Sequence, residues 1–106
     1  MNLSVDDEIR LKGFMPNKDD VKILAEFFYS FSDETRLRIV ILLIIKPLCV
    51  SDISNVLNIN QTTVSHQLKI LRNIGIVECD REGKSIVYYI KNKDIENILD
   101  LSVDCV

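Results

Sequence analysis

Polar side chains suited to binding nucleic acid gather in one stretch of the sequence, residues 60–73. If this stretch is helical, at roughly 100° per residue, one side carries hydroxyl, imidazole, amide and cationic groups but no acid. We call this set the polar arc, and it consists of Thr62, Ser65, His66, Lys69, Arg72 and Asn73. Such groups bond phosphates and base edges in the major groove of DNA. The pattern predicts a recognition helix, and the alternative is a solvated helix face that happens to lack acids.

The apolar side of the same stretch indicates how the polar arc is positioned. Val64, Leu68 and Leu71 follow the i, i+4, i+7 spacing of a helix face that packs on a core. Asn60 is a residue type that caps helix N-termini, and Gly75 tolerates the positive φ at which helices often end. The sequence therefore predicts a helix bounded by these two residues, with its polar arc turned outward.

A shorter helix is expected just before this one, over residues 50–57, with Ile53, Val56 and Leu57 facing inward. Residues 58–60 leave room only for a tight turn between the two helices. Two helices joined by so short a turn, the second carrying the polar arc, are typical of the helix-turn-helix motif.

Two segments rich in β-branched and aromatic residues, 76–80 and 85–90, are predicted to be strands, with residues 81–84 as the tip of a hairpin. A hairpin after a helix-turn-helix predicts a winged helix, with Arg81 and Lys84 placed to contact phosphate or the minor groove. The alternative is a solubilising loop that carries charges of both signs. The candidate DNA-binding residues are Gln61, Thr62, Thr63, Ser65, His66, Gln67, Lys69, Arg72, Arg81 and Lys84.

The charge is distributed unevenly along the chain. The net charge of −3 argues, taken globally, against a strongly basic nucleic-acid binder. Residues 60–93 nevertheless hold six cations and three acids, for a net +3, whereas residues 1–59 come to −2 and residues 94–106 to −4. The positive charge therefore lies on the predicted helix-turn-helix and wing, as expected when one face of the molecule meets phosphate.

Length and composition indicate a single globular domain. The 106 residues, 47% of them apolar, are enough for one core. The longest apolar run, residues 39–45, is far shorter than the roughly 20 residues of a membrane span. The acidic N-terminus has no apolar signal core, so a cytoplasmic protein with three reduced cysteines is expected.

Two further helices are expected before the helix-turn-helix. The first begins near Asp19 and carries a wide apolar face, and the second is capped by Ser32 or Asp33, is apolar almost all round and ends at Pro47. The predicted fold is mainly α with a small β-hairpin, a winged helix-turn-helix of order α-α-α-α-β-β-α. It spans residues 19–106 and follows an N-terminal arm, residues 1–18, with room for a short helix.

A last helix is predicted to open at Asp94. Its apolar stripe, and the aromatic face of the helix that begins near Asp19, could bury against a second copy of the chain about a two-fold axis. The alternative is that both faces only cap the monomer core. The candidate dimer-interface residues are Leu24, Phe27, Phe28, Phe31, Ile95, Ile98 and Leu99.

Four motifs in order resemble those of the ArsR/SmtB family of small winged-helix repressors. Residues 31–39 resemble its D-P-T-R-L-R-I entry, and residues 47–53 its E-L-C-V-C-D-L box. Residues 63–71 are similar to its S-x-V-S-x-H-L-x-x-L recognition helix, and residues 81–84 with Tyr88 are similar to its R-x-G-[KR]…Y wing. The resemblance covers about residues 21–101. It implies a homodimer, paired through its first and last helices, that binds a palindromic operator in double-stranded DNA, blocks transcription and lets go when an effector binds.

The sequence departs from the resemblance at the metal sites. Metal-sensing members often place two thiolates in the box, but the second position here is Ser51, whose hydroxyl is a poor ligand for such metals. Another family site uses Asp and His pairs on the last helix, whereas the one histidine here, His66, is on the predicted recognition helix. Cys49, Cys79 and Cys105 remain as candidates for a site that senses metal, metalloid or oxidant. The alternative is that the first two are small buried apolar residues and the third a surface thiol.

Two other functional classes are alternatives to a DNA-binding regulator. A winged helix that binds only proteins would suit the acidic overall charge but not the acid-free polar arc. An enzyme is disfavoured, because the chain has one histidine, no Gly-rich phosphate loop among its three glycines, and no carboxylate pair that the spacing brings together.

Overall fold

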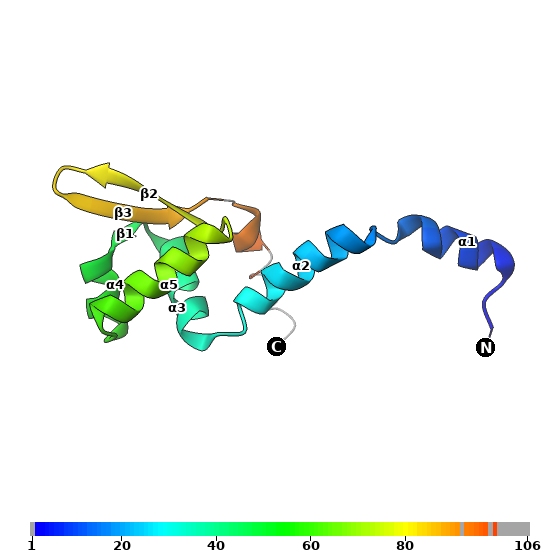
Figure 1. The fold of residues 1–106 in the computed structure, drawn as a ribbon, viewed down its shortest axis with the longest axis horizontal. Coiled ribbons are helices and arrows are strands. Elements are labelled where there is room, and N and C mark those ends of the chain that lie inside the picture. The colour runs from blue at the N-terminus through cyan, green and yellow to red at the C-terminus, as the bar shows by residue number, and fades with distance from the viewer. Residues whose placement is uncertain (1, 92, 98, 100–106) are drawn as a thin grey trace.

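The computed structural model describes residues 2–91, 93–97 and 99 of the chain. Its helices and strands are α1 (Val5–Phe14), α2 (Lys18–Ser30), α3 (Glu34–Ile45), β1 (Leu48–Cys49), α4 (Val50–Leu57), α5 (Gln61–Asn73), β2 (Val77–Glu82) and β3 (Ser85–Ile90) (Figure 1). Residues 94–97 are also helical, where a last helix was predicted to begin. The fold is the predicted mainly helical winged helix-turn-helix. Among the described residues, no helix has both the length and the apolar character needed to cross a bilayer.

The sheet has three antiparallel strands in the order β1-β3-β2, whereas only the hairpin of β2 and β3 was predicted. The additional strand, β1, pairs Leu48 with Tyr88 and Cys49 with Val87. A two-residue strand shows no alternation of apolar and polar residues, so periodicity could not reveal it. It forms because the link between α3 and α4 runs along the free edge of β3.

The hairpin is longer than predicted. Arg81 and Glu82 belong to β2, where they pair with Ile86 and Ser85, so the loop consists only of Gly83 and Lys84. Gly83 has φ 61°, and glycine is the preferred residue for a positive φ in a two-residue hairpin loop. The wing is therefore a ladder of paired strands almost to its tip, which holds Arg81 and Lys84 on a regular frame.

One hydrophobic core unites α3, α4, α5, the start of β2 and the last described helical segment. Its buried members are Ile39, Val40, Leu43, Ile53, Val64, Leu68, Leu71, Ile76, Val77 and Ile95. The prediction that α3 is buried on nearly all sides was wrong, because Ile41 is 46% exposed and Ile45 75% exposed. Val56, predicted to face inward, is 62% exposed, since the short helix α4 turns only its Ile53 side fully into the core.

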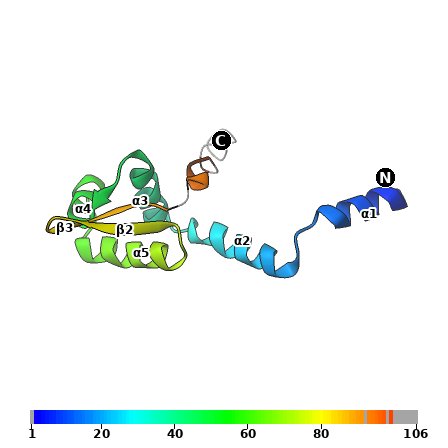
Figure 2. The ribbon, with the colours of Figure 1, turned by 90° about the horizontal axis from the view of Figure 1, so that it is seen from above.

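Seen from above, the hairpin runs between α5 on one side and α3 and α4 on the other, while α2 and α1 extend away from this body (Figure 2). This extension gives the chain principal dimensions of 62 × 27 × 20 Å. Phe27 and Phe31, near the end of α2, pack against the core. The remainder of α2 keeps large apolar side chains exposed, namely Val21, Ile23, Leu24, Phe28 and Tyr29.

Candidate nucleic-acid interface

The start of α5 is held by local hydrogen bonds in the turn after α4. Asn58 ends α4 in the left-handed conformation, φ 54°, which asparagine tolerates better than most residues. The hydroxyl of Ser54 donates to the carbonyl of Ile59. The side chain of Asn60 accepts a hydrogen bond of 2.7 Å from the backbone N–H of Thr62, which confirms the predicted cap. The turn between the two helices is therefore specified by its own residues.

The end of α5 directs the chain into the wing. The N–H of Ile76 donates to the carbonyl of Leu71 at 3.0 Å, and the N–H of Gly75 donates to that of Arg72 at 3.1 Å. This pair of bonds is the Schellman motif, and it requires the positive φ that Gly75 has, 81°. Ile76 and Leu71 are both buried, which supplies the apolar contact that accompanies the motif.

The two predicted sides of α5 are both found. The three apolar residues Val64, Leu68 and Leu71 are fully buried, with no exposed surface. Every residue of the polar arc is exposed, and so are two further candidates at the start of the helix, Gln61 and Thr63. The helix therefore presents hydroxyl, imidazole, amide and cationic groups to solvent from a side that carries no acid.

Arg72 is already engaged in the free protein. Its Nε lies 2.8 Å from Oε1 of Glu78, on β2, where the wing leaves α5. The same carboxylate oxygen accepts the backbone N–H of Cys79 at 3.1 Å. The pKa of Glu78 is lowered chiefly by the bond from Cys79 and then by Arg72, and the pKa of Arg72 is raised chiefly by its bond to Glu78. Arg72 thus joins α5 to the wing, and an anion that bound Arg72 would compete with Glu78.

A groove of about 650 Å³ runs between α5 and the wing. Its lining combines cations, hydroxyls and an amide with one acid: Ser65, Lys69, Arg72, Asn73, Glu78 and Tyr88. Partial burial raises the pKa of Tyr88, which keeps its phenol protonated and able to donate a hydrogen bond. These donors suit an anionic backbone that enters between the helix and the hairpin.

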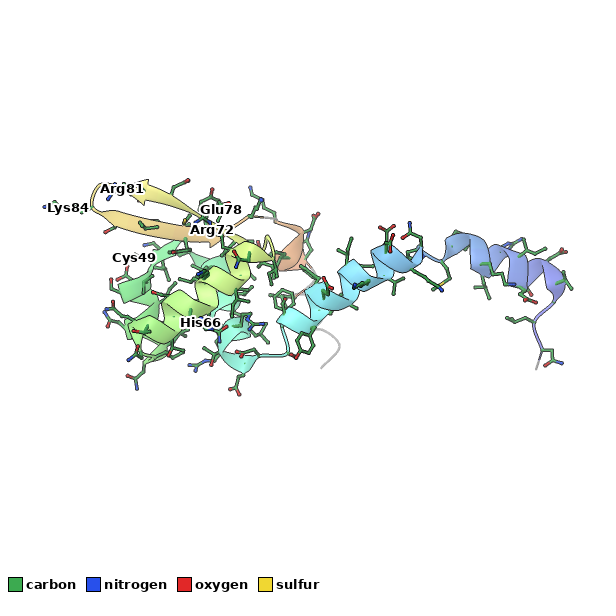
Figure 3. All side chains as sticks on the ribbon, viewed as in Figure 1. Cys49, His66, Arg72, Glu78, Arg81 and Lys84 are labelled. Atoms are coloured by element: carbon green, nitrogen blue, oxygen red, sulfur yellow. The ribbon has the colours of Figure 1, made fainter. Side chains whose placement is uncertain are left out.

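The wing cations lie apart from the Arg72–Glu78 pair. Arg81 and Lys84 are at the free end of the hairpin, whereas Arg72 and Glu78 lie together where the hairpin meets α5, and His66 lies along α5 (Figure 3). Arg81 and Lys84 are both exposed. The candidate cations are therefore distributed along the molecule rather than gathered at one point.

Gln67 differs from the other candidates on α5. It is half-buried, and its Oε1 accepts a hydrogen bond of 3.0 Å from Nε of Arg36 on α3. Sequence reasoning missed Arg36, which lies 31 residues from its partner. No local spacing could have revealed that contact, because only the packing of α3 on α5 brings the two side chains together.

The candidate dimer residues differ in how far their side chains are exposed. Leu24 and Phe28 are 49% and 55% exposed, so their apolar surfaces are accessible to a second copy. Phe27 and Phe31 are half-buried, with their rings in an edge contact at a centroid separation of 5.1 Å. Ile95 is only 2% exposed and belongs to the monomer core, which favours the alternative explanation for that residue. Of the other two, Leu99 is half-buried and packs against the core, whereas Ile98 lies outside the described residues.

The cysteines do not assemble a metal site in the described part of the chain. The sulfur of Cys49 lies 3.2 Å from Oγ of Ser51 and 3.2 Å from Oδ2 of Asp52. One thiol and one carboxylate fall short of the four ligands of a structural zinc site, and no group of three His, Cys, Asp or Glu side chains gathers among the described residues. Cys79 is half-buried on β2, and Cys105 lies outside the described residues.

Comparison with known proteins agrees with this architecture. Residues 33–78 match the family model described as bacterial regulatory protein, arsR family. The chain is 38% identical over 96 residues to the cadmium resistance transcriptional regulatory protein CadC of Listeria innocua, covering 90% of this chain and 80% of the relative.

Solved structures show the same fold. The crystal structure of Rv0081 from Mycobacterium tuberculosis superposes with a TM-score of 0.76 at 28% identity, over 84% of this chain and 90% of that one. The solution structure of the homodimeric winged helix-turn-helix DNA-binding domain of Mb0332 from Mycobacterium bovis gives 0.75 at 26% identity, over 87% of each chain. The acid-free helix, the wing and these relatives together lead to one assignment. The chain belongs to the ArsR family and is a DNA-binding winged helix-turn-helix transcriptional regulator, not an enzyme.

Proposed function

We propose that the protein is a homodimeric repressor that acts in the cytoplasm. Each subunit would place α5 in a major groove of a palindromic operator, and binding of an effector would release the DNA. The observation that carries this proposal is the polar arc, which is exposed along its whole length and acid-free on a helix whose opposite side is fully buried. An ordinary solvated helix face mixes acids with cations, whereas a face that meets phosphate excludes acids.

The proposed contacts divide by chemistry. Thr62, Thr63, Ser65 and His66 would bond base edges or phosphates from the first half of α5, beside Gln61. Lys69, Arg81 and Lys84 would supply positive charge along the backbone, at α5 and at the hairpin. In this proposal Arg72 contributes to the groove beside the wing while it remains bonded to Glu78.

Dimerisation is supported by the exposed apolar side of α2. A helix with this much uncovered apolar surface gains free energy by packing on a second copy, and two-fold pairing is the commonest arrangement among oligomers. One structural relative, the Mb0332 domain, is described as homodimeric. A two-fold dimer would engage half-sites about one helical turn, or ~34 Å, apart.

Effector release is proposed from family membership. The CadC relative is named for cadmium resistance, so a metal ion is a candidate effector, yet the described residues build no metal site. Titration with zinc or arsenite, followed by thiol accessibility and by release of bound DNA, tests whether the cysteines sense it. A thiol sensor requires a metal-dependent change in both readouts.

Binding to DNA of random sequence at low salt is the direct test of the proposal. Affinity that falls steeply as salt rises is expected, because phosphate contacts release counterions. A winged helix that binds only proteins would show no such affinity. Selection of bound duplexes from a random pool should then yield paired, inverted half-sites, and enrichment of single sites alone would contradict the dimeric arrangement.

A further inference from the structure

One arginine joins three helices of the chain. Arg36 lies in the first turn of α3, where its backbone N–H donates to Oδ1 of the capping residue Asp33 at 2.9 Å. Its Nε donates to Oε1 of Gln67 on α5 at 3.0 Å, and its Nη1 donates to the carbonyl of Ser30, the last residue of α2, at 3.0 Å. A single guanidinium therefore links the end of α2 to the middle of the recognition helix.

The bond to Ser30 lies at the point that determines the direction of α2. Ser30 is 4% exposed, whereas the exposed apolar residues of α2 include Leu24 and Phe28, which lie six and two residues earlier. Figure 1 shows α2 reaching the body only at this end. A helix held at one end points in the direction that the contacts at that end impose, which here are the packing of Phe27 and Phe31 and the bond from Arg36.

Helix chemistry explains why this position needs a guanidinium. The last four carbonyls of a helix lack intrahelical partners. In α2 those of Phe27, Phe28 and Tyr29 accept hydrogen bonds from residues within the next three positions, and that of Ser30 accepts Arg36. A cation is favoured at this negative end of the helix dipole, and the planar fork of arginine lets it address two acceptors at once. Lysine keeps the charge but lacks the fork.

We propose that Arg36 is a positioning residue for operator recognition. It sets the angle between α2 and α5, and thus the separation of the two recognition helices when α2 pairs with its copy. This inference rests on the proposed homodimeric binding of DNA. It assigns Gln67 to the internal link rather than to a base contact, so loss of the link should change the preferred spacing of half-sites and leave the bases within each half-site unchanged.

The test is selection of duplexes from a random pool in which the distance between half-sites is free. Four proteins are compared: wild type, Arg36→Lys, Gln67→Met, and Arg38→Lys as the matched control on the same helix. Arg38 is exposed, so Arg38→Lys tests the same type of substitution at a position that does not bond to Gln67 or Ser30. Gln67→Met keeps a side chain of similar length but removes the acceptor.

Wild type and Arg38→Lys should enrich one half-site spacing. Arg36→Lys and Gln67→Met should enrich the same half-site bases over a broader range of spacings. Both should also bind the wild-type duplex roughly two- to tenfold more weakly, the range expected for one lost hydrogen bond. Affinity for random duplex and its salt dependence should stay as in wild type.

Two results would overturn the inference. One is an unchanged spacing distribution in Gln67→Met, which also decides the matter if Arg36→Lys fails to fold. The other is a changed base preference at one position with unchanged spacing, which would make Gln67 a base-reading residue. Failure of the proposed function itself looks different, because wild type would then enrich no paired half-sites.

Discussion

At the scale of single residues, the cations beside the recognition helix differ in what holds them. Arg72 is bonded to Glu78 at 2.8 Å, whereas Lys69 is exposed on α5 and Lys84 is exposed at the hairpin tip. An exposed cation meets phosphate at little cost, but a bonded one must first leave its carboxylate. Lys69 and Lys84 should therefore each contribute more than Arg72 to the affinity for the phosphate backbone of DNA.

We predict that Lys69→Ala and Lys84→Ala each weaken binding to all duplexes about equally, whatever the sequence. The plot of log affinity against log salt should lose about one unit of slope per substitution, because one phosphate contact fewer is made. Fluorescence anisotropy over a salt series measures both quantities. Lys18→Ala, at the start of α2, is the control and should leave the slope unchanged; a slope unchanged in the two test variants would remove these residues from the interface.

We also predict that Glu78 stabilises the fold in a pH-dependent way. Its pKa is lowered in the folded protein, so its contribution is present above the ordinary glutamate pKa of about 4.3 and is lost as acid protonates the carboxylate. The difference in unfolding free energy between wild type and Glu78→Gln should therefore be largest near neutral pH and shrink below about pH 4. Urea denaturation at several pH values measures it, and a difference that is constant with pH would contradict the assignment.

At the scale of elements, the termini of α5 determine where the recognition helix lies and how the wing leaves it. Asn60 caps the beginning, and the Schellman motif around Gly75 closes the end. Both are local structures that depend on a few adjacent residues. Their effect is not local, since β2 begins only two residues after Gly75 and takes its direction from that turn.

We predict that Gly75→Ala destabilises the protein by about 1 kcal/mol, the cost of placing an L-residue at a left-handed backbone position. Steric clash does not contribute, because an added Cβ at Gly75 would meet no atom within 4 Å. Gly13→Ala is the matched control: it also has open space around the added Cβ but lies within α1, where alanine is the better helix former. Chemical denaturation should show a loss for the first variant and none for the second.

At the scale of the whole molecule, the single chain leaves one large apolar surface exposed, on α2. The body has a continuous core, yet α2 extends from it with its apolar side exposed and contributes only its last turn to that core. Such an exposed apolar surface lowers the solubility of a monomer, whereas a dimer can bury it. The shape of the chain therefore agrees with the proposed two-fold pairing.

We predict that Phe28→Asp and Leu24→Asp shift the protein from dimer to monomer, because each places a charge in a surface that must lose its water. Sedimentation velocity measures the change, and circular dichroism should show retained helices because neither residue is buried in the core. Ile86→Asp is the control and should remain dimeric, since Ile86 is similarly exposed, at 47%, but lies on the wing rather than on α2. Dimers that persist in both α2 variants would exclude this surface as the interface.

The sequence alone determined the features that depend on near neighbours. The spacing of Val64, Leu68 and Leu71 predicted which side of α5 is buried, and the cap at Asn60 and the stop at Gly75 predicted its bounds. The order of four helices and a hairpin followed from similar local patterns. Periodicity and capping are properties of a few consecutive residues, so they can be recognised without knowing what packs where.

Only the tertiary structure decided which distant side chains meet. Strand β1 exists because the link after α3 happens to run beside β3, and its two residues carry no pattern of their own. The bonds from Arg36 to Gln67 and Ser30, like the bond from Arg72 to Glu78, require whole elements to be placed first. Two members of the predicted DNA-contacting set are consequently engaged within the protein. The physical reason is that a local pattern specifies the face of a helix, whereas the partner of a side chain depends on where other elements come to lie.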